Sequence, residues 1–312
     1  TAENRSIANK PWHVLDVCES KVPGNFVLTI LVDRQLRKIT VKYPRRFFVH
    51  CHQPIPNSNF NLSHHKLPHT AKKTLYEIVV NDEQEFRQIL PNLHTSVFAH
   101  PNVEGVYEAD LYSPMRDLIL SFGPVIKASA ESKLYASDSI TPLPEIAYLN
   151  SNVPVNYAYL YVIESEGRSV WTLFTAHTCD VFIIDPFNKK QIGNVKTILQ
   201  QILGTEGLFC RSNDVSANVV FVEDEATIQK SIIKTLQKPT ILLTNQEAVV
   251  AESDDVHPIV LPTSNYLLGP LDWQRAALRR ACEEAHRTSL LLVEATQLAS
   301  YARLPLVYVL RN

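Results

Sequence analysis

The residues best suited to hold a metal ion are histidines and one cysteine in the segment 50–69. Six such side chains occur there: His50, Cys51, His52, His64, His65 and His69. A structural zinc site takes four ligands with short paired spacings, and a second cysteine is missing here. We therefore expect a polar, proline-containing loop over 51–73 and predict no metal site, while the role of the histidines stays open.

A second set of residues consists of cations in and after the predicted strand 36–43. Arg37, Lys42, Arg45 and Arg46 carry charges of the kind that contact phosphates in nucleic-acid-binding proteins. An antiparallel sheet with one solvated face shows the same alternation without any ligand. The formal net charge of −2 favours this solvated face. A DNA-binding module formed by the basic strand and loop at 34–73 stays as an alternative.

A third set lies on a predicted helix near the C-terminal end. Arg275 and Arg279 are four residues apart and therefore share one helix face, where they are candidates for binding an acidic partner. Glu283 and Glu284 follow at helical spacing. Ion pairing with these two carboxylates is the alternative, and it is the commoner arrangement on a helix surface.

The elements that must position these side chains are mostly strands up to about residue 130. Apolar alternation and β-branched runs predict strands over 12–17, 24–32, 36–43, 45–50, 74–80 and 103–108. Short helices are expected over 82–90 and 114–122. The stretch 157–187 then predicts three adjacent antiparallel strands, at 157–163, 170–176 and 181–184. Their large side chains are nearly continuous, which indicates a sheet covered on both faces.

Beyond these central strands the pattern is α/β. Helices are expected over 195–203 and 224–236, the latter with Asp224 as its N-cap, and strands over 216–222 and 239–243. The longest helical pattern covers 271–300, with a break near 287–289. We expect its apolar residues to lie inside, namely Leu278, Cys282, 290–293 and Leu298.

The length of 312 residues suggests two domains. We predict a polar tail over 1–10, a β-rich domain over 11–130, a linker over 131–150 and an α/β domain over 151–312. Five cysteines without a CxxC pair fit a reducing compartment, and no apolar run approaches the ~18 residues that a membrane span needs. The chain does not begin with methionine, and we expect it to be a piece of a longer protein.

Several short motifs resemble one family over nearly the whole chain, from about residue 10 to residue 312. They are WHVLDV at 12–17, YPRRFFVH at 43–50, VEGVYE at 103–108, LDWQR at 271–275 and ASYARLPLVYVL at 299–310. These segments resemble the C-terminal, non-catalytic half of the catalytic subunits of eukaryotic DNA polymerase epsilon, a degenerate family B polymerase. The resemblance implies a family B N-terminal-like domain over 11–130. It also implies an inactivated RNase H-like domain of the DEDD exonuclease type over 151–312, with a mixed sheet and helices.

The resemblance also allows a test of the catalytic motifs of active relatives. Their first motif reads Asp-Ile-Glu on a strand, and Val162 stands here at the aspartate position while Glu164 matches the glutamate. Their second motif begins with asparagine and ends with aspartate. Asn245 matches the former, and Val250 occupies the latter position.

Their third motif, Tyr-x-x-x-Asp, has no counterpart in this chain. Gln274 and Leu278 stand near its two ends when residues are counted back from Pro305. Valine and leucine offer no oxygen to a hard cation, and one glutamate does not hold two Mg²⁺. We therefore predict no catalytic residue, no metal site and no cofactor in this segment, although the parent protein it resembles is a DNA-directed DNA polymerase.

What the resemblance implies is a structural role in DNA replication in the nucleus. The segment would support assembly of the polymerase with its accessory subunits and with the replicative helicase. The alternatives are the DNA-binding module at 34–73, a cryptic 3′–5′ exonuclease, and a segment of another inactivated family B polymerase. No membrane association is expected.

Overall fold

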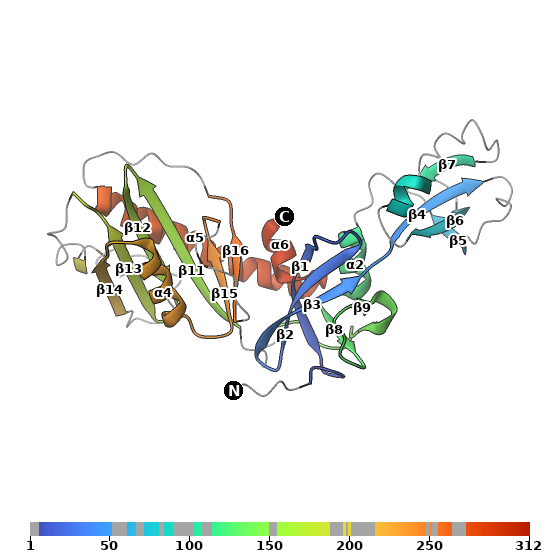
Figure 1. Ribbon diagram of the computed structural model, residues 1–312, viewed down its shortest axis with the longest axis horizontal. Coiled ribbons are helices and arrows are strands. Elements are labelled where there is room, and N and C mark those ends of the chain that lie inside the picture. Colours follow the sequence, from blue (N-terminus) through green and yellow to red (C-terminus); the bar gives the residue numbers. More distant parts are fainter. Residues whose placement is uncertain are drawn as a thin grey trace. The chain divides into compact units, whose positions relative to one another are not determined.

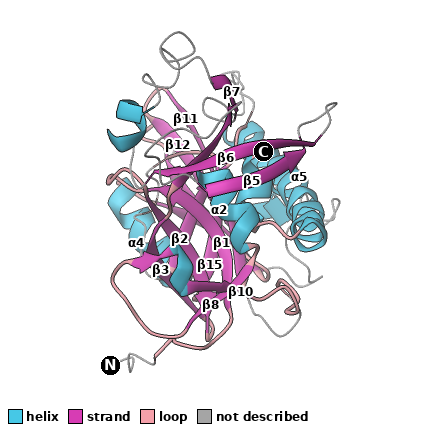
Figure 2. Ribbon diagram, turned by 90° about the vertical axis from the view of Figure 1, so that its right-hand side faces the viewer, coloured by secondary structure: helices cyan, strands magenta, loops and turns pink. Residues whose placement is uncertain are grey.

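The structure is a computed structural model, and it describes residues 6–51, 61–66, 72–80, 84–89, 103–107, 114–149, 155–187, 196–197, 199–200, 216–247, 250, 255–263 and 273–312. The chain divides into two compact units. The first contains residues 1–30 and 38–148, and the second contains residues 31–37 and 149–312. The described part is strand-rich, with three sheets and one long helix near the C-terminal end (Figure 2).

The first unit is built mainly around a six-stranded sheet in the order β10-β8-β1-β2-β3-β9. Its strands are β1 (Trp12–Glu19), β2 (Asn25–Val32), β3 (Gln35–Lys42), β8 (Val125–Ala128), β9 (Tyr135–Ala136) and β10 (Ile140–Pro142). Asp33 and Arg34 form the turn between β2 and β3 with φ angles of 50° and 64°. Two consecutive positive φ values match the hairpin twist, which is why this turn joins neighbouring antiparallel strands.

A second, four-stranded sheet in this unit has the order β5-β6-β4-β7. Its strands are β4 (Arg45–Cys51), β5 (Asn61–Lys66), β6 (Lys72–Val80) and β7 (Val103–Tyr107). The expected loop over 51–73 is therefore wrong in part, because residues 61–66 pair antiparallel with β6. Backbone pairing needs no apolar side chain, so a polar strand such as β5 escapes a search for hydrophobic alternation.

The segment 131–150, expected to be a linker, contains regular structure. After β8 it forms β9, a 3-10 turn (Ser137–Ser139) and β10, and β10 pairs with β8 while β9 pairs with β3. Tyr135 and Ile140 are buried. These two large side chains hold a proline-punctuated stretch against the first sheet, where composition alone indicates a linker. The helix α2 (Pro114–Phe122) begins at Pro114, as predicted.

The second unit has one mixed, six-stranded sheet in the order β14-β13-β12-β11-β15-β16. Its strands are β11 (Asn156–Ser165), β12 (Arg168–Phe174), β13 (Thr178–Ile184), β14 (Ser216–Phe221), β15 (Thr240–Thr244) and β16 (Val256–Val260). The three predicted antiparallel strands of 157–187 are confirmed as β11, β12 and β13. β15 and β14 add parallel to β11 and β13, and β16 extends the sheet beyond β15.

Helices cover both faces of this sheet, as the continuous large side chains of its strands predict. α4 (Glu225–Thr235) contributes Ile228 and Ile232 to the apolar core on one face, while α5 (Trp273–Ala302) lies against the opposite face (Figure 1). Asp224 is the N-cap of α4, and its carboxylate accepts a hydrogen bond of 2.7 Å from the backbone N–H of Thr227. That bond lowers the pKa of Asp224.

Two expectations for α5 are wrong. The helix runs through 287–289 without a break, since neither proline nor glycine interrupts it there and Thr288 is buried. The apolar residues 290–293 and Leu298 were expected inside, but only Leu292 of this set is buried. Pro305 follows α5 and precedes α6 (Leu306–Arg311).

The expected helices at 82–90 and 195–203 fall partly outside the described residues. Residues 84–89, 196–197 and 199–200 are helical. Among the described helices, none is long and apolar enough to cross a membrane.

Candidate functional site

Val162 and Asn245, which the catalytic-motif test pairs, lie in contact in the second unit. β11 and β15 run parallel until Leu160 opposite Thr244, so Asn245 follows directly after the paired part of β15. The Asn245 side chain accepts a hydrogen bond from the Val162 N–H and donates one to the Val162 carbonyl, each 2.8 Å long. The amide therefore continues the ladder by side chain, and both its groups are engaged with backbone.

Val162 and Val250 belong to one apolar core. Their exposed fractions are 2% and 4%, and they share a cluster with Leu160, Trp171 and the buried isoleucines of α4. Residues of β11 alternate between the two faces, so Ala158, Leu160 and Val162 all point to the α4 side. The space that the motif test assigns to metal-binding aspartates is therefore occupied by hydrocarbon.

Glu164, the one carboxylate at a matched position, lies outside this core. It is exposed near the end of β11, where it is paired in register with Ser169 of β12. With Glu166 and Glu225 it lines an open cavity of about 360 Å³ around the β11–β12 turn. Arg168 also lines this cavity, and its guanidinium lies 3.5 Å from the carboxylate of Glu166. Among the described residues, no group of three or more His, Cys, Asp or Glu side chains is arranged to hold a metal ion.

The two residues that stand near the ends of the third motif have different environments at the start of α5. Gln274 donates a hydrogen bond of 2.8 Å to the carboxylate of Asp185, which follows β13 and also accepts from the Phe187 N–H at 3.0 Å. Leu278 is fully buried. Asp185 is itself buried, and its bonds tie the start of α5 to the end of β13. A carboxylate with this role has no sequence signature beyond its position after a strand.

The four cations considered for phosphate binding are divided between two sheets. Arg37 and Lys42 lie on β3, and Arg37 donates a 3.2 Å bond to the side chain of Gln35. Arg45 and Arg46 begin β4 of the other sheet. The Arg45 guanidinium lies 3.5 Å from the ring centroid of Phe86, a cation–π contact, and Arg46 forms a 3.1 Å ion pair with Glu77.

The arginines at the start of α5 pair with carboxylates of their own helix. Arg279 lies 3.5 Å from Glu283, and Arg275 is exposed. Glu284 is buried and contacts Arg280 one turn before it and Arg287 one turn after it, the latter at 2.7 Å. Pairing within the helix, the alternative drawn from the spacing, is thus observed for Arg279.

The histidine-rich segment lies largely outside the described residues. His50 contacts the carboxylate of Glu104 on β7, and burial raises the pKa of the Cys51 thiol. His64 and His65 lie on β5, whose side chains are not described, and His52 and His69 fall outside the described ranges. The role of this segment stays a prediction.

Comparison with known proteins gives one consistent relationship. The DNA polymerase epsilon catalytic protein from Aspergillus fumigatus is 22% identical over 340 residues, which cover 95% of this chain. Its counterpart from Schizosaccharomyces pombe is 22% identical over 339 residues, again covering 95% of the chain. Most of the chain is distantly homologous to these catalytic subunits. The counterpart from Arabidopsis thaliana is 24% identical over 200 residues, or 60% of the chain.

The DNA polymerase epsilon catalytic subunits are much longer than this chain. The matched regions make up 15% of the two fungal proteins and 9% of the plant protein. The chain thus spans about 15% of the length of the curated relatives that it matches. No protein-family model matches the chain.

Proposed function

We propose that this chain is a non-catalytic segment from the C-terminal half of the catalytic subunit of a DNA polymerase epsilon, with a structural role in DNA replication. The first unit would correspond to the N-terminal domain of a family B polymerase. The second would be an RNase H-like, DEDD-type exonuclease domain without its catalytic residues. The distant homology over 95% of the chain supports the first part of this proposal, and the mixed sheet between α4 and α5 fits the second.

One observation carries the loss of catalysis. Val162 and Val250 stand where the resemblance expects metal-binding aspartates, and both are buried in one apolar cluster. Two-metal catalysis needs several carboxylates around the attacking and leaving oxygens of the phosphodiester. Asn245 is committed to the backbone of Val162, and Glu164 lies beyond the core. The residues present therefore do not fit a pair of metal ions.

The proposed role is assembly. A retained core without catalytic residues still offers a rigid surface, and we propose that this surface connects the polymerase to its accessory subunits and to the replicative helicase in the nucleus. The polymerase activity of the whole protein would reside in other parts of it. The engaged side chains of Arg45 and Arg46 favour this role over the DNA-binding module at 34–73.

A nuclease assay tests the loss of catalysis. The purified chain is incubated with single-stranded DNA in Mg²⁺ or Mn²⁺, beside Glu164→Ala and the control Glu294→Ala, which changes an exposed glutamate of α5. We expect no digestion above the level of the Glu164→Ala variant. Digestion that is lost in Glu164→Ala and kept in Glu294→Ala would overturn the proposal.

A co-purification experiment tests the role in assembly. The chain is expressed together with the accessory subunits of the same organism's polymerase epsilon and is recovered through a tag on one of those subunits. We expect the chain to be retained in amounts close to stoichiometric. Failure to recover it at low and moderate salt would contradict the structural role.

A further inference from the structure

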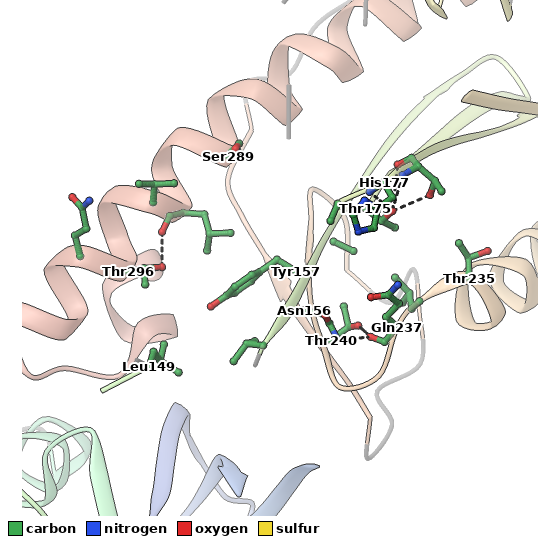
Figure 3. Close-up of a pocket in the computed structure, with 18 residues that line it drawn as sticks. Leu149, Asn156, Tyr157, Thr175, His177, Thr235, Gln237, Thr240, Ser289 and Thr296 are labelled. Carbon is green, nitrogen blue, oxygen red and sulfur yellow. Dashed lines mark hydrogen bonds between the residues drawn. The ribbon is translucent and has the colours of Figure 1, made fainter. Parts of the chain in front are cut away.

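A cavity of about 500 Å³ lies in the second unit, at the end of β11 opposite to Val162 (Figure 3). It is lined by the start of β11, the turn after β12, the end of α4 and the second half of α5. Figure 3 shows the Tyr157 side chain extending from β11 toward α5 across this space. The volume lies within the ~300–1,000 Å³ of typical ligand sites and has room for more than one large side chain.

The lining of the cavity is uncharged. None of its described lining residues is Asp, Glu, Lys or Arg. Several of its polar groups are already bonded within the protein: Thr296 donates to the Leu292 carbonyl at 2.7 Å, and Asn156 donates to the Pro239 carbonyl at 3.1 Å. What the walls offer to an occupant is therefore mainly apolar surface, from Ala158 and neighbouring leucine and valine side chains.

The outward face of α5 changes in character along the helix. In its first half this face carries charged residues, including Arg275, Arg279 and Glu283. Residues 288–302 contain a single charge, Glu294. Their exposed side chains are instead large and apolar, with exposed fractions of 54% for Leu290, 44% for Val293, 53% for Leu298 and 90% for Tyr301.

These apolar residues and the cavity are continuous. Val293 is exposed and also lines the cavity, while Leu290 and Gln297 stand on the same side of the helix one turn away. A helix face in contact with water alone is polar, as the first half of α5 illustrates. Exposed apolar patches that adjoin a hollow mark interaction sites.

We propose that residues 290–301 of α5 and the adjoining cavity form one docking surface for an amphipathic helix of a protein partner, whose apolar side chains enter the cavity. The inference rests on the proposed function, because the partner is sought among the accessory subunits of the polymerase epsilon assembly. The face from Leu290 to Tyr301 is about 16 Å long, which matches a partner helix of about three turns.

The charges at the surface select this class of partner. Nucleic acids and anionic membranes need lysine or arginine at their binding site, and 288–302 contains neither. A metal ion or phosphate finds no charged ligand in the described lining of the cavity. An apolar helix that lies in a groove, with side chains at i, i+3, i+4 and i+7 as anchors, needs none of these groups.

The surface is tested in the co-purification experiment with matched variants. Leu298→Ser/Tyr301→Ser changes two strongly exposed residues of α5, and the control Val22→Ser/Leu120→Ser changes two exposed apolar residues of the first unit. We expect the α5 variant to lose at least about tenfold in retained chain, since buried anchors dominate interface energetics, and the control to stay within about twofold.

The outcomes separate the two proposals. Retention of the α5 variant at the level of the unmodified chain overturns the docking surface and leaves the structural role intact. If the unmodified chain is not retained at all, the structural role falls, and the docking surface falls with it. If the unmodified chain self-associates and the α5 variant is monomeric by sedimentation, the occupant is a second copy and the proposed partner is wrong.

Two further variants test the cavity and the accessibility of the face. Ser289→Trp places a large ring at the lining, while Ser300→Trp does so on the same helix outside it. We expect reduced retention only for Ser289→Trp, provided that circular dichroism shows both variants folded; equal retention would contradict insertion into the cavity. In the isolated chain, Leu298→Cys should react with a maleimide much faster than the buried Cys282. Equally slow labelling would mean that the chain covers this face itself, and would overturn the proposal.

Discussion

The two ends of β11 differ in what fills the space beside them. At the C-terminal end, Val162 lies in hydrocarbon and its backbone is bonded on both sides by Asn245. At the N-terminal end, Tyr157 borders a cavity of about 500 Å³ next to an apolar helix face. The closed end is the one where the resemblance places chemistry, and the open end has no counterpart among the catalytic motifs.

This difference suggests how a catalytic domain becomes a structural one. Once aspartates are replaced by valines, the former site can be filled to the density of a protein core, which stabilises the fold. The open end does not gain stability from its empty volume, so its shape needs another explanation. Binding of a partner is the explanation that we propose.

The largest effect that sharpens this comparison is expected for Val162→Asp. A carboxylate at this position has no cation or second carboxylate to share a metal with, and an uncompensated buried charge costs about 3–5 kcal/mol. Urea unfolding, together with hydrogen exchange of the β11 amides, measures the loss. Val162→Ala serves as the control and should lose less. Equal stability of the two variants would mean that the closed end is open to water.

Asn245→Ala should have the next largest effect. The variant leaves the Val162 N–H and carbonyl without their side-chain partners, and unsatisfied buried backbone groups cost about 1–3 kcal/mol each. Asn245→Asp keeps the acceptor and loses the donor, so its unfolding free energy should lie between those of the alanine variant and the unmodified chain. An alanine variant with unchanged unfolding free energy would contradict the ladder-extending role of this amide.

Alkaline pH tests the opposite face of β11, with a smaller effect. Burial raises the pKa of Tyr159, and the nearby charge of Glu284 adds to it. Because the folded pKa is above the unfolded value of about 10, the stability from the neutral phenol is fully present below that pH. It is lost as the pH rises from there toward the folded pKa. The unfolding free energy of Tyr159→Phe should therefore fall less steeply above pH ~10, whereas Tyr301→Phe, at an exposed position, should follow the unmodified chain.

The smallest effect is expected at the open end. Thr296→Val keeps the shape of a cavity-lining side chain and removes a hydroxyl bonded to its own helix, so the unfolding free energy should change by no more than about 0.5 kcal/mol. Urea unfolding of the isolated chain measures it. A loss of several kcal/mol would show that the cavity wall is as tightly determined as the core at Val162.

Much of the second unit was predictable because it depends on local patterns. The strands β11, β12 and β13 follow from three apolar runs separated by short turns, and Glu166 and Gly167 form one of these turns with φ angles of 51° and 76°. The N-cap at Asp224 follows from its residue type before an amphipathic pattern.

Other features depend on contacts that a local pattern does not specify. β16 was not predicted, because its apolar run is short and contains Pro258, which is tolerated at the edge of a sheet. The exposure of Leu290 and Leu298 was missed since an apolar residue on a helix lies inside only where another element covers it. The strand β5 has no apolar alternation at all.

The candidate site shows the same division. The resemblance identified Val162 and Asn245, but the contact between them joins residues 83 positions apart and depends on the parallel pairing of β11 with β15. The cavity next to Tyr157 combines side chains from four separate segments. No motif announces such a combination, and only the exceptionally apolar, charge-poor sequence of 288–302 hints at it.

The central claim, that the former catalytic centre is closed by apolar side chains, is tested most directly by Mn²⁺. Paramagnetic broadening in NMR spectra of the methyl-labelled chain reports which side chains approach the ion. We predict that the methyl signals of Val162 and Val250 keep their line widths at Mn²⁺ concentrations that broaden signals near exposed carboxylates. Selective broadening of Val162 and Val250 at low Mn²⁺, abolished by Glu164→Ala, would show a metal bound at this centre and would contradict the account.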